Sequence, residues 1–165
     1  MKKMTIRKST YKDLETIMEL FEDAKKIMRA NGNTEQWSDG YPSREIAAKD
    51  IDNGNSYVCC NENGVVIATF AFIIGADPTY ARIYDGSWID DTLPYGTIHR
   101  LASTASSHGI ASEVIHWCFE RIPNLRADTH SDNRILQHIL PREGFRFCGI
   151  IHLADGSPRL AYQKI

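Results

Sequence analysis

The chain has 165 residues, 42% of them hydrophobic and 24% charged, and its formal net charge is −2, values that predict one globular domain over residues 1–165. The slight acidity argues against a nucleic-acid partner. The sequence has no polybasic run and no apolar run of about 18 residues, so no membrane partner is expected either.

Apolar spacing and turn residues divide the first half of the chain into two helices and several strands. Thr10 is a predicted N-cap, and Asn31-Gly32 is a predicted stop for the same helix. The turn at 61–64 predicts a hairpin between its flanking strands. The expected elements are a strand at 5–8, helices at 10–31 and 43–53, and strands at 56–60, 65–74 and 81–88.

The second half alternates strands and helices before a final hairpin. Its expected elements are a strand at 97–103, a helix at 110–122, a strand at 126–129, a helix from 132 to Pro141, and strands at 145–152 and 159–164. Pro141 is expected to end or kink its helix, because proline supplies no N–H. The whole order, β-α-α-β-β-β-β-α-β-α-β-β, predicts a mixed α/β sheet with helices packed on it.

The segment from Ile98 to Cys118 is the most informative part of the chain. It predicts a strand, a turn of small residues at 106–112, and an amphipathic helix. Such a turn leaves backbone N–H groups unpaired at a helix N-terminus, where the donors and the helix dipole favour a phosphate or diphosphate. The alternative is a simple serine N-cap.

This turn resembles the diphosphate motif of the GNAT superfamily of N-acetyltransferases, Q/R-x-x-G-x-G/A. Gly109 and Ala111 match its small positions, whereas Ser106 departs from the family's Gln or Arg. A second block, from Asn133 to Gly144-Phe145, matches the family's asparagine and Gly-Phe at similar spacing. Together the two blocks identify the chain as similar to this superfamily.

The resemblance extends over residues 4–164 and implies a fold in more detail. It implies an α/β (α+β) fold with a mixed, mostly antiparallel sheet, helices on both faces, and a splayed pair of central strands. In this family the pantetheine of acetyl-CoA lies in the gap between those strands. The residues expected to contact acetyl-CoA are Leu101, Ala102, Ser103, Ser107, His108, Gly109, Ile110, Ala111, Ser112 and Asn133.

The same resemblance suggests residues for proton transfer. The run from Ile98 to Ser103 is similar to the strand of arylalkylamine acetyltransferases in which a histidine serves in a proton path, so His99 is a candidate base. The alternative for His99 is a sheet histidine bonded to a neighbour. Asp85 is a candidate to anchor a cationic amine or to act through water, and its alternative is a strand-end aspartate.

Three further residues are candidates for binding the acceptor. Trp37 and Tyr41 lie in the loop between the first two helices, which covers the acceptor cleft in the family. They either stack on a substrate or close the edge of the core. His130 follows a strand and either faces the acceptor or forms a structural hydrogen bond.

The predicted activity is acetyl transfer from acetyl-CoA to a primary amine of a small molecule or peptide by direct attack. Many family members protonate the leaving thiolate with a tyrosine, and this chain has Leu140 at that position. The alternative is therefore a non-catalytic acyl-CoA-binding or sensor domain. A homodimer is also consistent with the resemblance.

The four cysteines and the N-terminus bear on location. Cys59, Cys60, Cys118 and Cys148 show no zinc-ligand spacing, which predicts free thiols in a reducing cytoplasm and no metal site. No apolar segment follows the N-terminal charges, so no signal peptide is expected.

Overall fold

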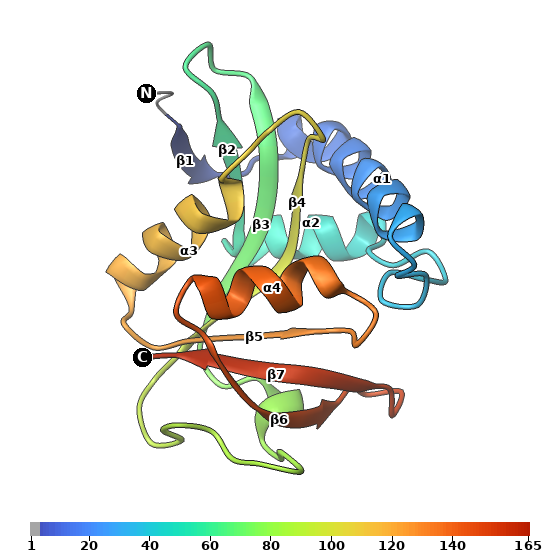
Figure 1. Cartoon of the computed structure of the whole chain (residues 1–165). Coiled ribbons are helices and arrows are strands. Elements are labelled where there is room, and N and C mark those ends of the chain that lie inside the picture. Colours follow the sequence, from blue (N-terminus) through green and yellow to red (C-terminus); the bar gives the residue numbers. More distant parts are fainter. Residues whose placement is uncertain (1–3) are drawn as a thin grey trace.

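The structure, a computed structural model, describes residues 4–165. Its centre is one seven-stranded sheet with the order β1-β2-β3-β4-β5-β7-β6 (Figure 1). Neighbouring strands are antiparallel except β4 and β5, which are parallel, so the predicted mostly antiparallel sheet is confirmed. The strands are β1 (Thr5–Lys8), β2 (Ser56–Cys60), β3 (Val66–Ile74), β4 (Gly96–Ser103), β5 (Leu125–Thr129), β6 (Arg146–His152) and β7 (Pro158–Lys164).

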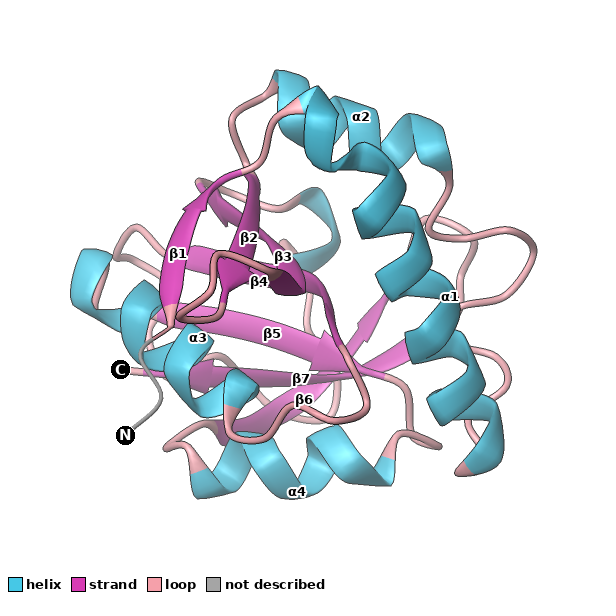
Figure 2. Ribbon diagram, turned by 90° about the horizontal axis from the view of Figure 1, so that it is seen from above, coloured by secondary structure: helices cyan, strands magenta, loops and turns pink. Residues whose placement is uncertain are grey.

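Helices cover both faces of the sheet, as predicted. Figure 2 shows α1 (Leu14–Ala30) and α2 (Arg44–Asp52) on one face and α3 (Ile110–Arg121) and α4 (Arg134–Arg142) on the other. Each face has its own apolar cluster, because each pair of helices buries its apolar side on the strands. The proline of α4 lies in its last turn, and the helix ends one residue later.

The central strands β4 and β5 pair only at their start. Gly96 pairs with Leu125 and Thr97 with Arg126, and no further pair joins the two strands. The pairing of β4 with β3 shifts register around Arg100, whose φ is 54°, a β-bulge that bends the strand. The bend turns β4 away from β5, which confirms the predicted splayed pair.

The predicted strand at 81–88 is wrong. The chain there forms a short 3-10 helix, η2 (Pro78–Tyr80), and then a loop whose contact with the sheet is a single bridge between Tyr84 and Ile150. A turn with φ of 56° at Asp85 breaks the extended run, and Gly86 packs so closely that an added Cβ would lie 1.9 Å from a β6 carbonyl oxygen. The other predicted elements are present with small shifts of their ends.

Within residues 4–165, no helix is long and apolar enough to cross a membrane, and no group of three His, Cys, Asp or Glu side chains is placed to hold a metal ion. All four cysteines are buried and free. Burial raises the pKa of Cys59 to about 12 and also raises that of Cys118, so both remain neutral thiols.

Candidate active site

A cavity of about 730 Å³ lies at the gap between β4 and β5 and has walls from both faces of the sheet. One wall, the α3 end, is mainly apolar and includes Leu101, Ala111, Ile115, Leu136 and Leu140. The opposite wall, the His99 end, is polar and includes Trp37, Tyr41, Asp77, His99, Asp128, His130 and Arg159. The cavity therefore connects two chemically different surfaces through the sheet.

At the α3 end, the turn before the helix presents free backbone donors. Gly109 is the N-cap of α3 with φ of 72°, and a Cβ there would meet nothing within 4 Å. Among the residues that the structure describes, none accepts a hydrogen bond from the backbone N–H groups of residues 108–112. Free amides at a helix N-terminus form a favourable environment for an anion.

The side chains of this turn are only partly available to a ligand. Ala111 lines the cavity and His108 is exposed, but Ile110 is buried in the core between the sheet and α3. Ser107 pairs with Thr104 through their hydroxyls. Ser112 donates to Glu143 Oε2 at 2.6 Å, which ties α3 to the end of α4. The Ser112 hydroxyl thus makes an interhelical contact, and its predicted contact with acetyl-CoA stays a prediction.

Only some backbone groups of β4 face the gap between β4 and β5. Thr104 N–H donates to Ile67 in β3 at 3.0 Å. The backbone N–H and C=O groups of successive residues point to opposite edges of a strand, so Ala102, two residues before Thr104, also faces β3, and Ser103 faces the gap. Leu101 belongs to the bulge and lines the cavity. Of the three predicted backbone contacts, the one at Ala102 is turned away from the gap.

At the His99 end, His99 and Asp77 form a pair. His99 Nε2 lies 3.2 Å from Asp77 Oδ2, and both side chains are largely buried. Burial alone would raise the pKa of Asp77, but the hydrogen bonds from His99 and Thr79 outweigh burial and lower it to about 2. A neutral His99 that donates from Nε2 to this carboxylate keeps a lone pair on Nδ1. The pair is therefore suited to accept a proton.

A second carboxylate and a second histidine lie near this pair. Tyr80 donates its hydroxyl to Asp128 Oδ2 at 2.6 Å. Burial and the neighbouring Asp128 raise the pKa of Tyr80 well above its ordinary value, so the phenol stays neutral. His130 Nδ1 accepts the N–H of Asp132 at 3.0 Å, which assigns the proton of the neutral ring to Nε2.

The loop between α1 and α2 closes the His99 end. Trp37 is buried, packs edge-on against Phe21 with ring centroids 5.5 Å apart, and also lines the cavity. Tyr41 accepts a hydrogen bond from Arg100 at 3.0 Å, and Arg100 makes a two-bond ion pair with Asp50 of α2. Trp37 therefore closes the edge of the core, as one of its two predicted alternatives has it, and its stacking on a substrate stays a prediction.

Gln36 holds this loop to the rest of the site through one oxygen. Its Oε1 accepts hydrogen bonds from Asn33, Thr129, His130 and Asn133 at 3.0–3.4 Å. Asn133 in turn caps α4 by accepting the N–H of Leu136 at 3.0 Å. Both ends of the buried Asn133 amide therefore bond to protein, and the predicted cofactor contact of this residue stays a prediction.

Asp85 lies apart from the cavity. It is exposed in the loop that follows η2, next to the residue that bridges to β6. The predicted catalytic role depended on a strand at 81–88, which does not form. The carboxylates that the fold brings to the cavity are Asp77 and Asp128 instead.

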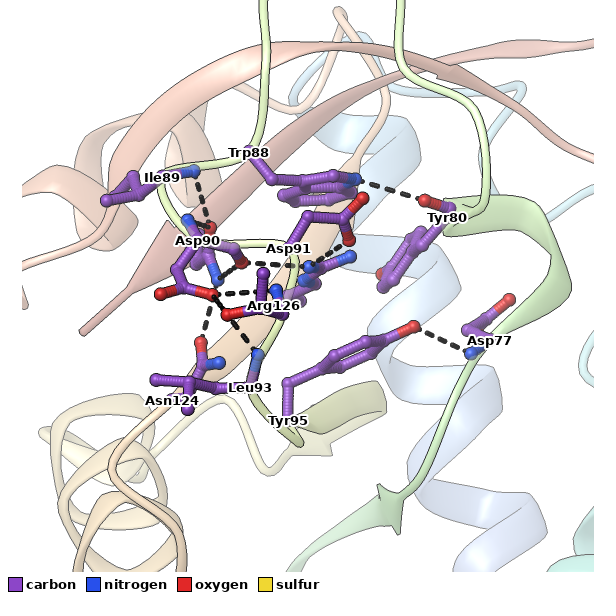
Figure 3. Close-up of polar contacts among 12 residues, drawn as sticks. Asp77, Tyr80, Trp88, Ile89, Asp90, Asp91, Leu93, Tyr95, Asn124 and Arg126 are labelled. Carbon is purple, nitrogen blue, oxygen red and sulfur yellow. Dashed lines mark hydrogen bonds and ion pairs between the residues drawn. The ribbon is translucent and has the colours of Figure 1, made fainter.

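The loop at 75–95, which carries Asp77, is anchored by a buried arginine of β5. The guanidinium of Arg126 lies 3.9 Å from the ring centroids of both Trp88 and Tyr95 and donates to Asp91 at 2.9 Å (Figure 3). Tyr95 then accepts the N–H of Asp77 at 2.7 Å. Sequence reasoning missed this anchor, and the available signal was the aromatic density of the loop.

Comparisons with known proteins place the fold. No family model and no curated protein matches the chain. A GNAT-family acetyltransferase from Streptococcus agalactiae is 37% identical, with 98% of this chain and 95% of that one covered and a TM-score of 0.88. One from Listeria monocytogenes is 20% identical over 98% and 94% of the two chains, with a TM-score of 0.72. The NatC complex bound to Gag peptide and CoA is 13% identical over 98% of each chain, with a TM-score of 0.60.

The splayed sheet and the cavity through it are thus those of an acyltransferase fold. The identity and coverage of the streptococcal protein give the family: this chain belongs to the GNAT acetyltransferases.

Proposed function

We propose that the protein transfers an acetyl group from acetyl-CoA to a primary amine. The observation that carries this proposal is the cavity through the β4–β5 gap, which has free amides near one opening and the His99–Asp77 pair in its opposite wall. The two reactants would enter from opposite faces and meet in the gap.

The residues of the α3 end fit acetyl-CoA. The N–H groups of residues 108–112 suit the diphosphate, and the open space at Gly109 permits close approach. The gap-facing backbone of Ser103 suits the amide groups of pantetheine. Apolar walls from Ile115, Leu136 and Leu140 exclude water around the thioester.

The His99 end fits a protonated amine. Asp77 and Asp128 are carboxylates in the cavity wall, and they attract an ammonium group. His99 accepts a proton from the amine, whose nitrogen then attacks the thioester carbon. Collapse of the tetrahedral intermediate breaks the C–S bond and releases the CoA thiolate, and the attacking nitrogen gives its second proton to solvent to form the neutral amide.

The chain supplies no tyrosine at the expected position for protonating this thiolate. Leu140 is 3% exposed and lines the cavity. A thiol has a pKa of about 8–9, so its thiolate is a stable leaving group that takes a proton from water. None of the four cysteines lines the cavity, which supports direct attack over a covalent acetyl-enzyme.

Free-thiol release from acetyl-CoA with a panel of primary amines tests the proposal. Amine-dependent release, with one N-acetylated product per thiol, is the expected result. Tight acetyl-CoA binding without turnover on any amine would contradict it and would favour a sensor domain.

A further inference from the structure

Three arginine side chains are buried on the face of the sheet opposite α3 and α4, and they differ in their partners. Arg100 pairs with Asp50, and Arg126 is held by two aromatic rings and Asp91. Arg159 of β7 is 7% exposed, and its one hydrogen bond goes to the carbonyl of Pro158 at 2.8 Å. Among the residues that the structure describes, no carboxylate lies within 4.0 Å of Arg159.

A buried guanidinium without an ion pair is unusual, because burial of a charge is costly unless the charge is paired. Arg159 lines the cavity, and none of its nitrogen atoms is among the sealed polar atoms that lack a partner. Its unused N–H groups therefore open to the cavity. The nearby Asp155 is exposed and accepts the N–H of Ser157 at 2.9 Å. Hydrogen bonds from Ser157 lower the pKa of Asp155, and the charge of Arg159 lowers it further, but the two side chains form no ion pair within 4.0 Å.

The position of Arg159 indicates which reactant carries the missing anion. Asp128 of β5 pairs in register with Ala161 of β7, and side chains of alternate residues share a face, so Arg159 lies on the face that carries Asp128. The N-terminus of α3, which suits the CoA phosphates, lies on the opposite face (Figure 2). The anion at Arg159 therefore belongs to the acceptor.

We infer, on the basis of the proposed function, that the acetyl acceptor is a small amine that also carries a carboxylate, as an α-amino acid does. The carboxylate forms a two-bond ion pair with Arg159, and the amine lies toward Asp128 and His99. Asp128 and Arg159 are diagonal neighbours, about 7–8 Å apart by strand geometry. Tyr80 donates to one oxygen of Asp128, and no ion pair joins Asp128 to Arg159, so both charges remain available to a zwitterion between them.

Matched acceptors test this inference. Thiol release is measured with the standard L-amino acids and with the α-carboxamide of each, for the wild type, Arg159→Gln and Arg159→Lys. The wild type should prefer its best amino acid over the amide by about 10- to 100-fold in kcat/KM, as expected for a charge-assisted pair. Arg159→Gln should bring this ratio close to one, and Arg159→Lys should retain part of it.

The exposed arginine of β6 provides the control, and Arg146→Gln should keep the wild-type ratio. A wild type that does not distinguish acid from amide would overturn the inference. An Arg159→Gln variant that loses both acceptors equally would overturn it as well.

A binding measurement separates this inference from the proposed function. If no amine is acetylated, the proposed function fails, and the thermal shift produced by the same amino acids decides the inference. A shift with an amino acid but not with its amide, absent in Arg159→Gln, would support the carboxylate site. No shift with any amino acid would overturn it.

The melting temperature without ligand gives a further outcome. Arg159→Gln removes an unpaired buried charge, so its melting temperature should equal or exceed that of the wild type. A large decrease would show that Arg159 is a structural residue and would overturn the inference.

Discussion

The two ends of the cavity differ in the chemical groups that they offer to a ligand. The α3 end offers apolar side chains and backbone N–H groups, and these N–H groups belong to one short segment, residues 103–112. The His99 end offers charged side chains from β4, β5, β7 and the loop at 75–95. Backbone donors are present whatever the side chains are, whereas a set of charges changes with each substitution. If the protein has the proposed function, its cofactor meets backbone donors that do not depend on side-chain identity, and its acceptor meets a surface that substitutions readily change.

The largest effect is expected from removal of the base at the His99 end. His99→Gln should lower kcat/KM for the acceptor by about 10²- to 10⁴-fold and flatten the alkaline rise of the rate, because the amine loses its proton acceptor. Acetyl-CoA affinity, measured by calorimetry, should change little. His116→Gln on α3, where the side chain is 78% exposed, is the matched control. An unaltered pH profile would remove His99 from the mechanism.

A substitution at Gln36 tests how the two ends are held together. Gln36→Leu should lower the free energy of unfolding by about 1–3 kcal/mol, because Asn133 and His130 lose a buried acceptor. Urea unfolding at neutral pH measures the change. Gln36→Glu keeps an oxygen acceptor in the same place and should recover most of the loss. Equal losses in both variants would show that the shape of the loop matters more than this oxygen.

A charge placed at the α3 end tests whether that end binds an anion. Ala111→Asp should weaken acetyl-CoA binding about tenfold, since one unit of charge near the diphosphate costs about 1 kcal/mol or more. An acid in the first turn of a helix is otherwise favourable, so the melting temperature should not fall. Ala111→Asn has the same shape without the charge, and equal affinities of the two variants would contradict the anion site.

The smallest effect concerns the pH dependence of stability. The folded-state pKa of Asp77 is about 2, below its ordinary value of 3.8. Its contribution to stability is therefore present above pH 3.8 and is lost as the pH falls toward 2. The melting temperature of Asp77→Asn should be below that of the wild type at pH 6, and the difference should shrink between pH 4 and pH 2. A difference in melting temperature that stays constant from pH 4 to pH 2 would show that the negative charge of Asp77 does not contribute to stability.

Sequence reasoning predicted the fold well, with one instructive exception. Helices and paired strands have periodic patterns that a short window reveals. The segment at 81–88 has residues that favour strands, and Tyr84 does make one bridge to β6. However, Tyr80, Trp88 and Tyr95 are buried because their side chains pack against the sheet from a loop. The sequence of the segment does not distinguish a residue buried in this way from a residue of a sheet strand.

The two ends of the site also differ in how well the sequence predicts them. The turn at Gly109 is contiguous in sequence, so its shape could be predicted from its residues. Asp77, Asp128 and Arg159 come from distant segments and meet only in the folded chain. Asp85 was predicted to lie in a strand next to the expected cleft, whereas a turn in the loop exposes it.

The passage of the cavity through the sheet has a consequence for inhibitor design. A compound that joins a pantetheine arm to an acceptor must thread its linker past the last paired residues of the two central strands, Thr97 and Arg126. Its two halves then point away from each other, toward opposite sides of the molecule. Linker length and thickness, more than the affinity of either half, should therefore decide whether a bisubstrate compound can bind.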